Sequence, residues 1–151
     1  IFGHNSIEQF KSIINRLTFK ELYVMPGNHT SGWKQVFEEQ KGMFWRLNSQ
    51  KVVNFVPNYL EAVVNQQLVV MSHYPILSFN GQSKGSFCLY GHVHGNLHQT
   101  GIGKLYSQAR TMEVTVEATS VPISMEQVTE TLSKVPLTVF DPHDLPMTTP
   151  R

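Results

Sequence analysis

Three short histidine-bearing motifs, each placed directly after an apolar run, constrain the fold of this chain more than any other feature. The motifs are Gly27-Asn28-His29, Ser72-His73-Tyr74-Pro75 and Gly91-His92-Val93-His94-Gly95. The runs before them, Leu22–Met25, Leu68–Met71 and Phe87–Tyr90, have the length and composition of buried strands. Parallel strands place their carboxyl ends at one edge of a sheet, so we expect loops that are distant in sequence to converge there.

The remaining pattern predicts an α/β fold. Helical spacing of apolar residues predicts helices over 6–17 and 31–41, and a Ser124–Gln127 capping box predicts a helix over 124–133. Strands are expected at 52–56 and 59–64, with a tight turn at 65–67, and clean alternation predicts a half-buried strand over 112–119. We expect one domain over residues 1–134, followed by an irregular proline-rich tail over 135–151.

The side chains of the three motifs suit a metal site assembled from several strand ends. Imidazole is the commonest protein ligand for transition metals, and an asparagine carbonyl adds a harder oxygen donor. If His92 and His94 are extended, their side chains point the same way, and the flanking glycines allow the backbone to approach a ligand closely. The wide spacing of the motifs excludes a local zinc knuckle.

Taken in this order, the GNH, SHYP and GHVHG motifs resemble the last three of five metal-site motifs of the calcineurin-like metallophosphoesterases, most closely the small phage and bacterial type. The resemblance covers about Leu22 to Gly95 and extends more loosely to the final predicted helix. It implies a sandwich of two facing sheets with helices outside. It also implies hydrolysis of phosphoesters at a site for two divalent ions, with Mn²⁺ expected and Fe, Zn or Mg as alternatives.

The same resemblance implies a role for each motif residue. Asn28, His73 and His92 would bind the second metal, and His94 would bind the first. His29 would be the catalytic histidine beside the phosphate, where it stabilises or protonates the leaving oxygen.

The family's first two motifs, Asp-x-His and Gly-Asp, do not occur in this sequence ahead of the first predicted helix. From the resemblance we therefore expect an N-terminally truncated domain that lacks its first strand or strands. Because those motifs supply the acidic ligands, we expect this 151-residue stretch to have little or no activity by itself.

Composition narrows the partners. A net charge of +1 does not favour nucleic acid, so we expect a small phosphoester or nucleotide as substrate, with a nuclease as a less favoured alternative. No apolar run reaches membrane-span length, so we expect no membrane partner. The single cysteine, Cys88, lies in an apolar stretch and is expected to be a buried thiol, which is compatible with a cytoplasmic setting.

A second hypothesis for the function is a binding scaffold of the same fold that has lost catalysis.

Overall fold

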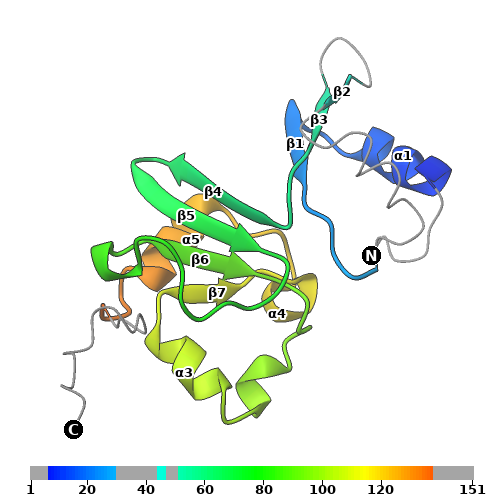
Figure 1. Cartoon of the computed structure of the whole chain (residues 1–151). Coiled ribbons are helices and arrows are strands. Elements are labelled where there is room, and N and C mark those ends of the chain that lie inside the picture. Colours follow the sequence, from blue (N-terminus) through cyan, green and yellow to red (C-terminus); the bar gives the residue numbers. More distant parts are fainter. Residues whose placement is uncertain (1–6, 30–43, 47–50, 138–151) are drawn as a thin grey trace, which may run out of the picture. The chain divides into compact units, whose positions relative to one another are not determined.

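The computed structural model describes residues 7–29, 44–46 and 51–137, and it confirms the general α/β class (Figure 1). The chain divides into two compact units, Ile1–Tyr59 and Leu60–Arg151. Within the described residues, each unit contains one β-sheet.

In its described part, the first unit packs one helix on a three-stranded sheet. Helix α1 (Ile7–Arg16) confirms the first predicted helix, and the strands are β1 (Glu21–Val24), β2 (Phe44–Arg46) and β3 (Val52–Phe55). The order is β1-β3-β2, with β1 parallel to β3 and β2 antiparallel to it. Phe10 and Ile14, one helical turn apart, are buried with Val53 and Phe55. The helix predicted over 31–41 lies outside the described residues.

The second unit is built on a four-stranded sheet in the order β4-β5-β6-β7. The strands are β4 (Tyr59–Val64), β5 (Gln67–Ser72), β6 (Phe87–Tyr90) and β7 (Thr111–Glu113). β5, β6 and β7 are parallel to one another. The predicted tight turn between β4 and β5 is present, and Asn65 and Gln66 adopt positive φ values of 50° and 66° there.

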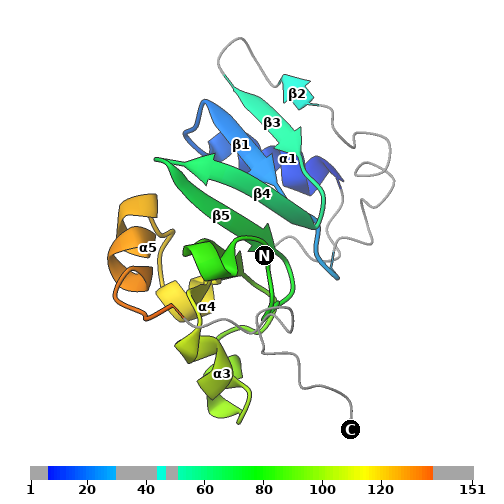
Figure 2. The same ribbon diagram turned by 60° about the vertical axis from the view of Figure 1, so that its left-hand side comes forward.

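Both faces of this sheet are covered. Helix α5 (Met125–Leu132) lies on one face, where Val128 and Leu132 are buried with Phe87 (Figures 1 and 2). On the other face Phe79, from the loop after β5, is buried with Val70 and Cys88. Alternate residues of β6 therefore belong to two separate apolar clusters, Phe87 and Leu89 to one and Cys88 to the other, as the two-residue period of a strand requires.

The predicted strand over 112–119 is wrong beyond its first two residues. β7 ends at Glu113, and the chain then forms the single-turn helix α4 (Val116–Thr119), which ends at Ser120 with a φ of 63°. The alternation had placed Glu113 in solvent, whereas its side chain is only 4% exposed. The Glu113 side chain is turned inward by its hydrogen bonds with the distant Gly95 N–H and the nearby Thr115 hydroxyl, and a period-two pattern cannot reveal these contacts.

The segment between β6 and β7 contains a short 3-10 helix, Leu97–Gln99, and helix α3 (Gly103–Gln108), neither of which was predicted. Tyr106 of α3 is buried, and its ring lies 5.5 Å from the ring of Tyr90 in β6. A cavity of about 290 Å³ lies between these tyrosines, β7, α4 and α5, and Glu113 lines it. Another 3-10 helix, Gln82–Lys84, interrupts the loop before β6.

The cysteine prediction is confirmed in its structural part. Cys88 is completely buried in β6, and burial raises the pKa of its thiol to about 12. None of the helices in the described part of the chain combines the length and apolar character that a membrane span requires.

The capping box of α5 provides a test of this fold. Ser124 accepts a hydrogen bond from the Gln127 backbone N–H, and the Gln127 side chain accepts one from the Ser124 N–H. We expect Ser124→Ala to lower the free energy of unfolding by about 1 kcal/mol, the usual cost of losing an N-cap. Urea unfolding followed by circular dichroism measures this. Ser133→Ala, at the other end of the same helix, is the matched control and should have little effect.

Candidate functional site

The parallel register of the second sheet brings two of the three motifs to one edge. Ser72 of β5 pairs with Tyr90 of β6, and Tyr90 pairs with Glu113 of β7. The next residues along each strand therefore begin three adjacent loops. The Gly91 N–H donates a hydrogen bond of 3.2 Å to the carbonyl of His73, which joins the first two loops. The expected convergence is confirmed for the motifs of this unit.

Three aromatic rings from these two loops form a cluster. The ring of His73 lies 5.1 Å from the ring of His92, and the Tyr74 ring lies 4.9 Å from His73 and 4.6 Å from His92. All three pairs meet edge to face, an arrangement that suits the positive edge and negative face of such rings. Tyr74 thus packs beside the two imidazoles that the resemblance assigns to one metal ion.

The expectation that His92 and His94 are extended is wrong. His92 has a φ of 74°, and the Val93 N–H donates a 2.9 Å hydrogen bond to the Gly91 carbonyl, which closes a γ-turn around His92. His94 and Gly95 follow with φ values of 51° and 78°, inside a turn closed by a 2.9 Å bond from the Asn96 N–H to the Val93 carbonyl. Two positive φ values at the centre of a turn are typical of type I′. Glycine flanks the motif, but histidine takes two of the three left-handed positions.

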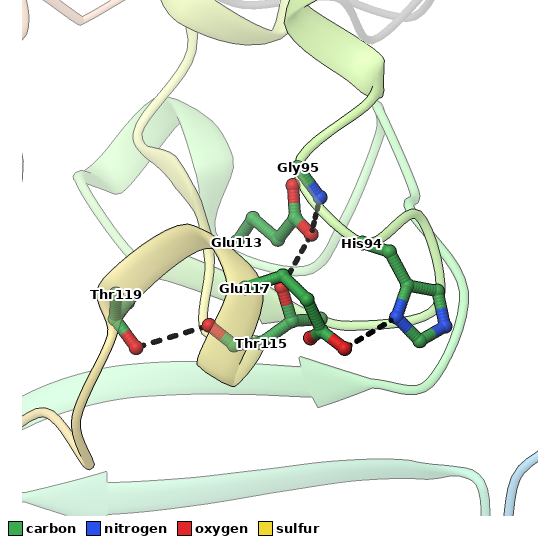
Figure 3. A network of polar contacts seen from close by, with 6 residues as sticks. All are labelled: His94, Gly95, Glu113, Thr115, Glu117 and Thr119. Atoms are coloured by element: carbon green, nitrogen blue, oxygen red, sulfur yellow. Dashed lines mark hydrogen bonds and ion pairs between the residues drawn. The ribbon is translucent and has the colours of Figure 1, made fainter.

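The Glu113 side chain holds the backbone of this loop in place (Figure 3). Its Oε1 atom accepts hydrogen bonds from the Gly95 N–H at 2.7 Å and from the Thr115 hydroxyl at 2.6 Å. Its Oε2 atom is buried, and among the described residues it has no hydrogen-bond partner. The carboxylate therefore fixes the backbone next to His94, and the burial of its second oxygen costs free energy of desolvation.

His94 is engaged by a second carboxylate. Its Nδ1 atom lies 2.9 Å from Oε1 of Glu117, which projects from helix α4 (Figure 3). The hydrogen bond with His94 is the main reason that the pKa of Glu117 is below its usual value. Both side chains are about half exposed, at 54% for His94 and 52% for Glu117. The pair is therefore formed at the surface, whereas Glu113 acts from inside.

The first motif belongs to the other unit. Asn28 and His29 lie in an exposed turn that follows β1, as the sequence predicted. The five predicted site residues thus fall into three groups. His73 and His92 are in contact with each other, and His94 pairs with Glu117. Asn28 and His29 follow strand β1 of the first sheet.

The donor set fits part of a transition-metal site. His73 and His92 supply two neighbouring imidazoles, which are suitable ligands for Mn²⁺, Fe or Zn. Within residues 7–29, 44–46 and 51–137, no group of three or more His, Cys, Asp or Glu side chains gathers closely enough to hold an ion. Two imidazoles are thus the part of such a site that the described residues bring together.

Sequence reasoning missed Glu113 and Glu117. Both were placed on the solvent side of a strand that does not extend past Glu113. A usable signal was present, because Thr115 followed by an acidic residue two positions later is typical of a helix start. Thr115 is indeed the N-cap of α4.

The positive φ at His92 leads to a first test of the site. We expect His92→Gly to be more stable than His92→Ala by about 1 kcal/mol, because alanine retains the left-handed strain that glycine relieves. Comparing these two variants cancels the shared loss of the ring. At Val93, which is not among the described residues with positive φ, the order should reverse. Equal urea midpoints for the two His92 variants would argue against the strained turn.

Glu113 leads to a second test. Glu113→Ala removes the acceptor for both the Gly95 N–H and the Thr115 hydroxyl, and we expect it to lower the free energy of unfolding by about 3 kcal/mol. Glu113→Gln retains an oxygen in the Oε1 position, so it should cost clearly less. Thermal unfolding at several protein concentrations distinguishes destabilisation from association. If Glu113→Ala is as stable as the parent, the bracing role is wrong.

No protein-family model, curated protein or solved structure matches this chain. The proposal of a function therefore rests on the motifs and on the geometry of their loops.

Proposed function

We propose that this protein is a metal-dependent phosphoester hydrolase of the metallophosphoesterase type. The observation that carries the proposal is the contact between His73 and His92. They belong to the SHYP and GHVHG motifs, lie 19 residues apart in sequence, and come from the ends of two adjacent parallel strands. Placement of catalytic groups at the carboxyl ends of parallel strands is a general property of α/β enzymes.

The proposed roles are those that the resemblance implies, and the chemistry of each side chain suits its role. His73 and His92 would hold one divalent ion, and His94 would be a ligand of a second ion. The carbonyl of Asn28 is proposed as a metal ligand on the resemblance alone. The ions, when bound, would neutralise the phosphate oxygens and make water a stronger nucleophile at neutral pH. His29 would stabilise or protonate the leaving oxygen. Mn²⁺ is the favoured metal because the set mixes imidazoles with a hard amide oxygen, and Fe, Zn and Mg are the alternatives.

The resemblance also supports a finer proposal for the fold, an α/β/β/α sandwich of the metallophosphoesterase type. For the substrate we propose a small phosphoester or nucleotide. The net charge of +1 provides little of the phosphate attraction that duplex binding requires, so nucleic acid is not favoured.

A binding scaffold without catalysis is the second candidate. One observation favours it, because no three ligating side chains gather closely within the described residues. Such a protein would retain the loops and recognise a phosphorylated partner, with no turnover. The two candidates agree on the loops and differ in whether metal binding leads to hydrolysis.

Metal binding and hydrolysis should be measured on the protein as its gene encodes it. We expect Mn²⁺-dependent hydrolysis of an aryl phosphodiester or monoester, and a loss of Mn²⁺ affinity of at least about 100-fold in His73→Ala and in His92→Ala. That magnitude follows because partners outside the ligand shell already contribute 10–100-fold. Electron paramagnetic resonance measures free Mn²⁺ directly.

Glu130→Gln is the control for these variants, since Glu130 is exposed on α5 and pairs with Lys134. Mn²⁺ binding that His92→Ala abolishes, without any turnover, would favour the scaffold. Turnover that resists both chelation and His92→Ala would contradict the proposed function.

A further inference from the structure

Two carboxylates from one short segment act on two consecutive residues of the GHVHG loop. Glu113, at the end of β7, binds the N–H of Gly95, and Glu117, in α4, binds the side chain of His94 (Figure 3). The two glutamates are linked through Thr115, whose hydroxyl donates to Glu113 and which is the N-cap of α4. The backbone and the side chain of one turn are therefore held by the same segment.

The contact with Glu117 defines which nitrogen of His94 carries a proton. An ionised carboxylate can only accept hydrogen bonds, so a 2.9 Å contact with Nδ1 requires a proton on Nδ1. In a neutral imidazole the other nitrogen, Nε2, then carries the free lone pair. Figure 3 shows Nε2 on the side of the ring away from Glu117.

We propose that Glu117 is a positioning residue that holds His94 as the Nδ1–H tautomer and directs its Nε2 lone pair toward a divalent cation. This inference rests on the proposed function, because it assigns His94 a metal to bind. Carboxylate–histidine–metal arrangements are common, since the carboxylate fixes both the tautomer and the ring orientation and raises the basicity of the ligand.

The position of Glu117 is itself fixed by the fold. Helix α4 is a single turn, and the Thr119 hydroxyl lies within hydrogen-bond distance of the carbonyls of Thr115 and Val121, at 3.0 Å and 2.7 Å, so that it can donate its proton to either. The backbone of His94 is set by the turn and by the bond between Gly95 and Glu113. What remains free at His94 is the orientation of its ring, and Glu117 removes that freedom.

Orientation explains this contact better than stability does. Both side chains are about half exposed, and ion pairs at such positions contribute little to folding. The inner carboxylate, Glu113, already braces the loop. The contact of Glu117 with the His94 side chain therefore has its clearest effect on the orientation of the imidazole ring.

The tautomer can be measured without any metal. Long-range ¹H–¹⁵N spectra of the metal-free protein, at a pH well above the usual imidazole pKa, distinguish Nδ1–H from Nε2–H. We expect His94 of the parent to be mainly the Nδ1–H form and Glu117→Ala to shift it toward Nε2–H. Glu117→Gln keeps a carbonyl acceptor and should preserve the parent tautomer in part. Glu130→Gln, an equally exposed change on α5, should leave the spectrum of His94 unchanged.

Metal titration adds the second measurement. We expect Glu117→Ala to weaken Mn²⁺ binding about 10- to 100-fold, with Glu117→Gln in between. An Nε2–H tautomer in the parent, or a tautomer that Glu117→Ala does not change, would overturn the inference. A tautomer shift in a protein that binds no metal would support the positioning role and would count against the proposed function.

Discussion

The parallel pairing of β5, β6 and β7 is the constraint on which the candidate site depends. It aligns Ser72, Tyr90 and Glu113 across three strands, so the loops that carry the histidines and the bracing carboxylate all begin at one edge. The register is firmly specified because both faces are covered, with Phe87 packed on one side and Cys88 on the other. A slip of one residue would exchange the two faces and bury the wrong side chains. The apolar core thus determines where the polar chemistry lies.

Much of the fold could be predicted from local patterns. The apolar runs of β5 and β6, the helical stripe that includes Phe10 and Ile14, and the capping box of α5 each express a short-range rule that the structure follows. The prediction failed where a long-range contact prevailed. Residues 112–119 alternate as a strand does, but the Gly95 N–H, 18 positions earlier, draws the Glu113 side chain inward and the chain leaves the sheet. Helix α3 was missed because glycine at 101 and 103 obscures its start.

The site was predictable in its parts and less so in its geometry. The motifs indicated that the loops of His73 and His92 converge, and the two rings are in contact, because the ends of apolar strands are visible in sequence. The backbone conformation of the GHVHG loop was not predicted, because two of its left-handed residues are histidines and only one is a glycine. Glu113 and Glu117 act on the loop in different environments, because Glu113 is buried and Glu117 is half exposed. Glu113 acts where the dielectric is low and a hydrogen bond contributes more, while Glu117 acts in water, where ring orientation is the larger effect.

Cys88 has a consequence beyond packing. It is the single cysteine of the chain, it lies in an inner strand of the second sheet, and its thiol is both inaccessible and protonated at physiological pH. Thiol reagents attack the thiolate, so they label this protein only when the sheet opens around β6, and the labelling rate reports on that opening. The strand that leads into the GHVHG loop therefore contains a natural probe of its own opening. A ligand that binds the folded protein would slow the labelling of Cys88, and no engineered cysteine would be needed to detect it.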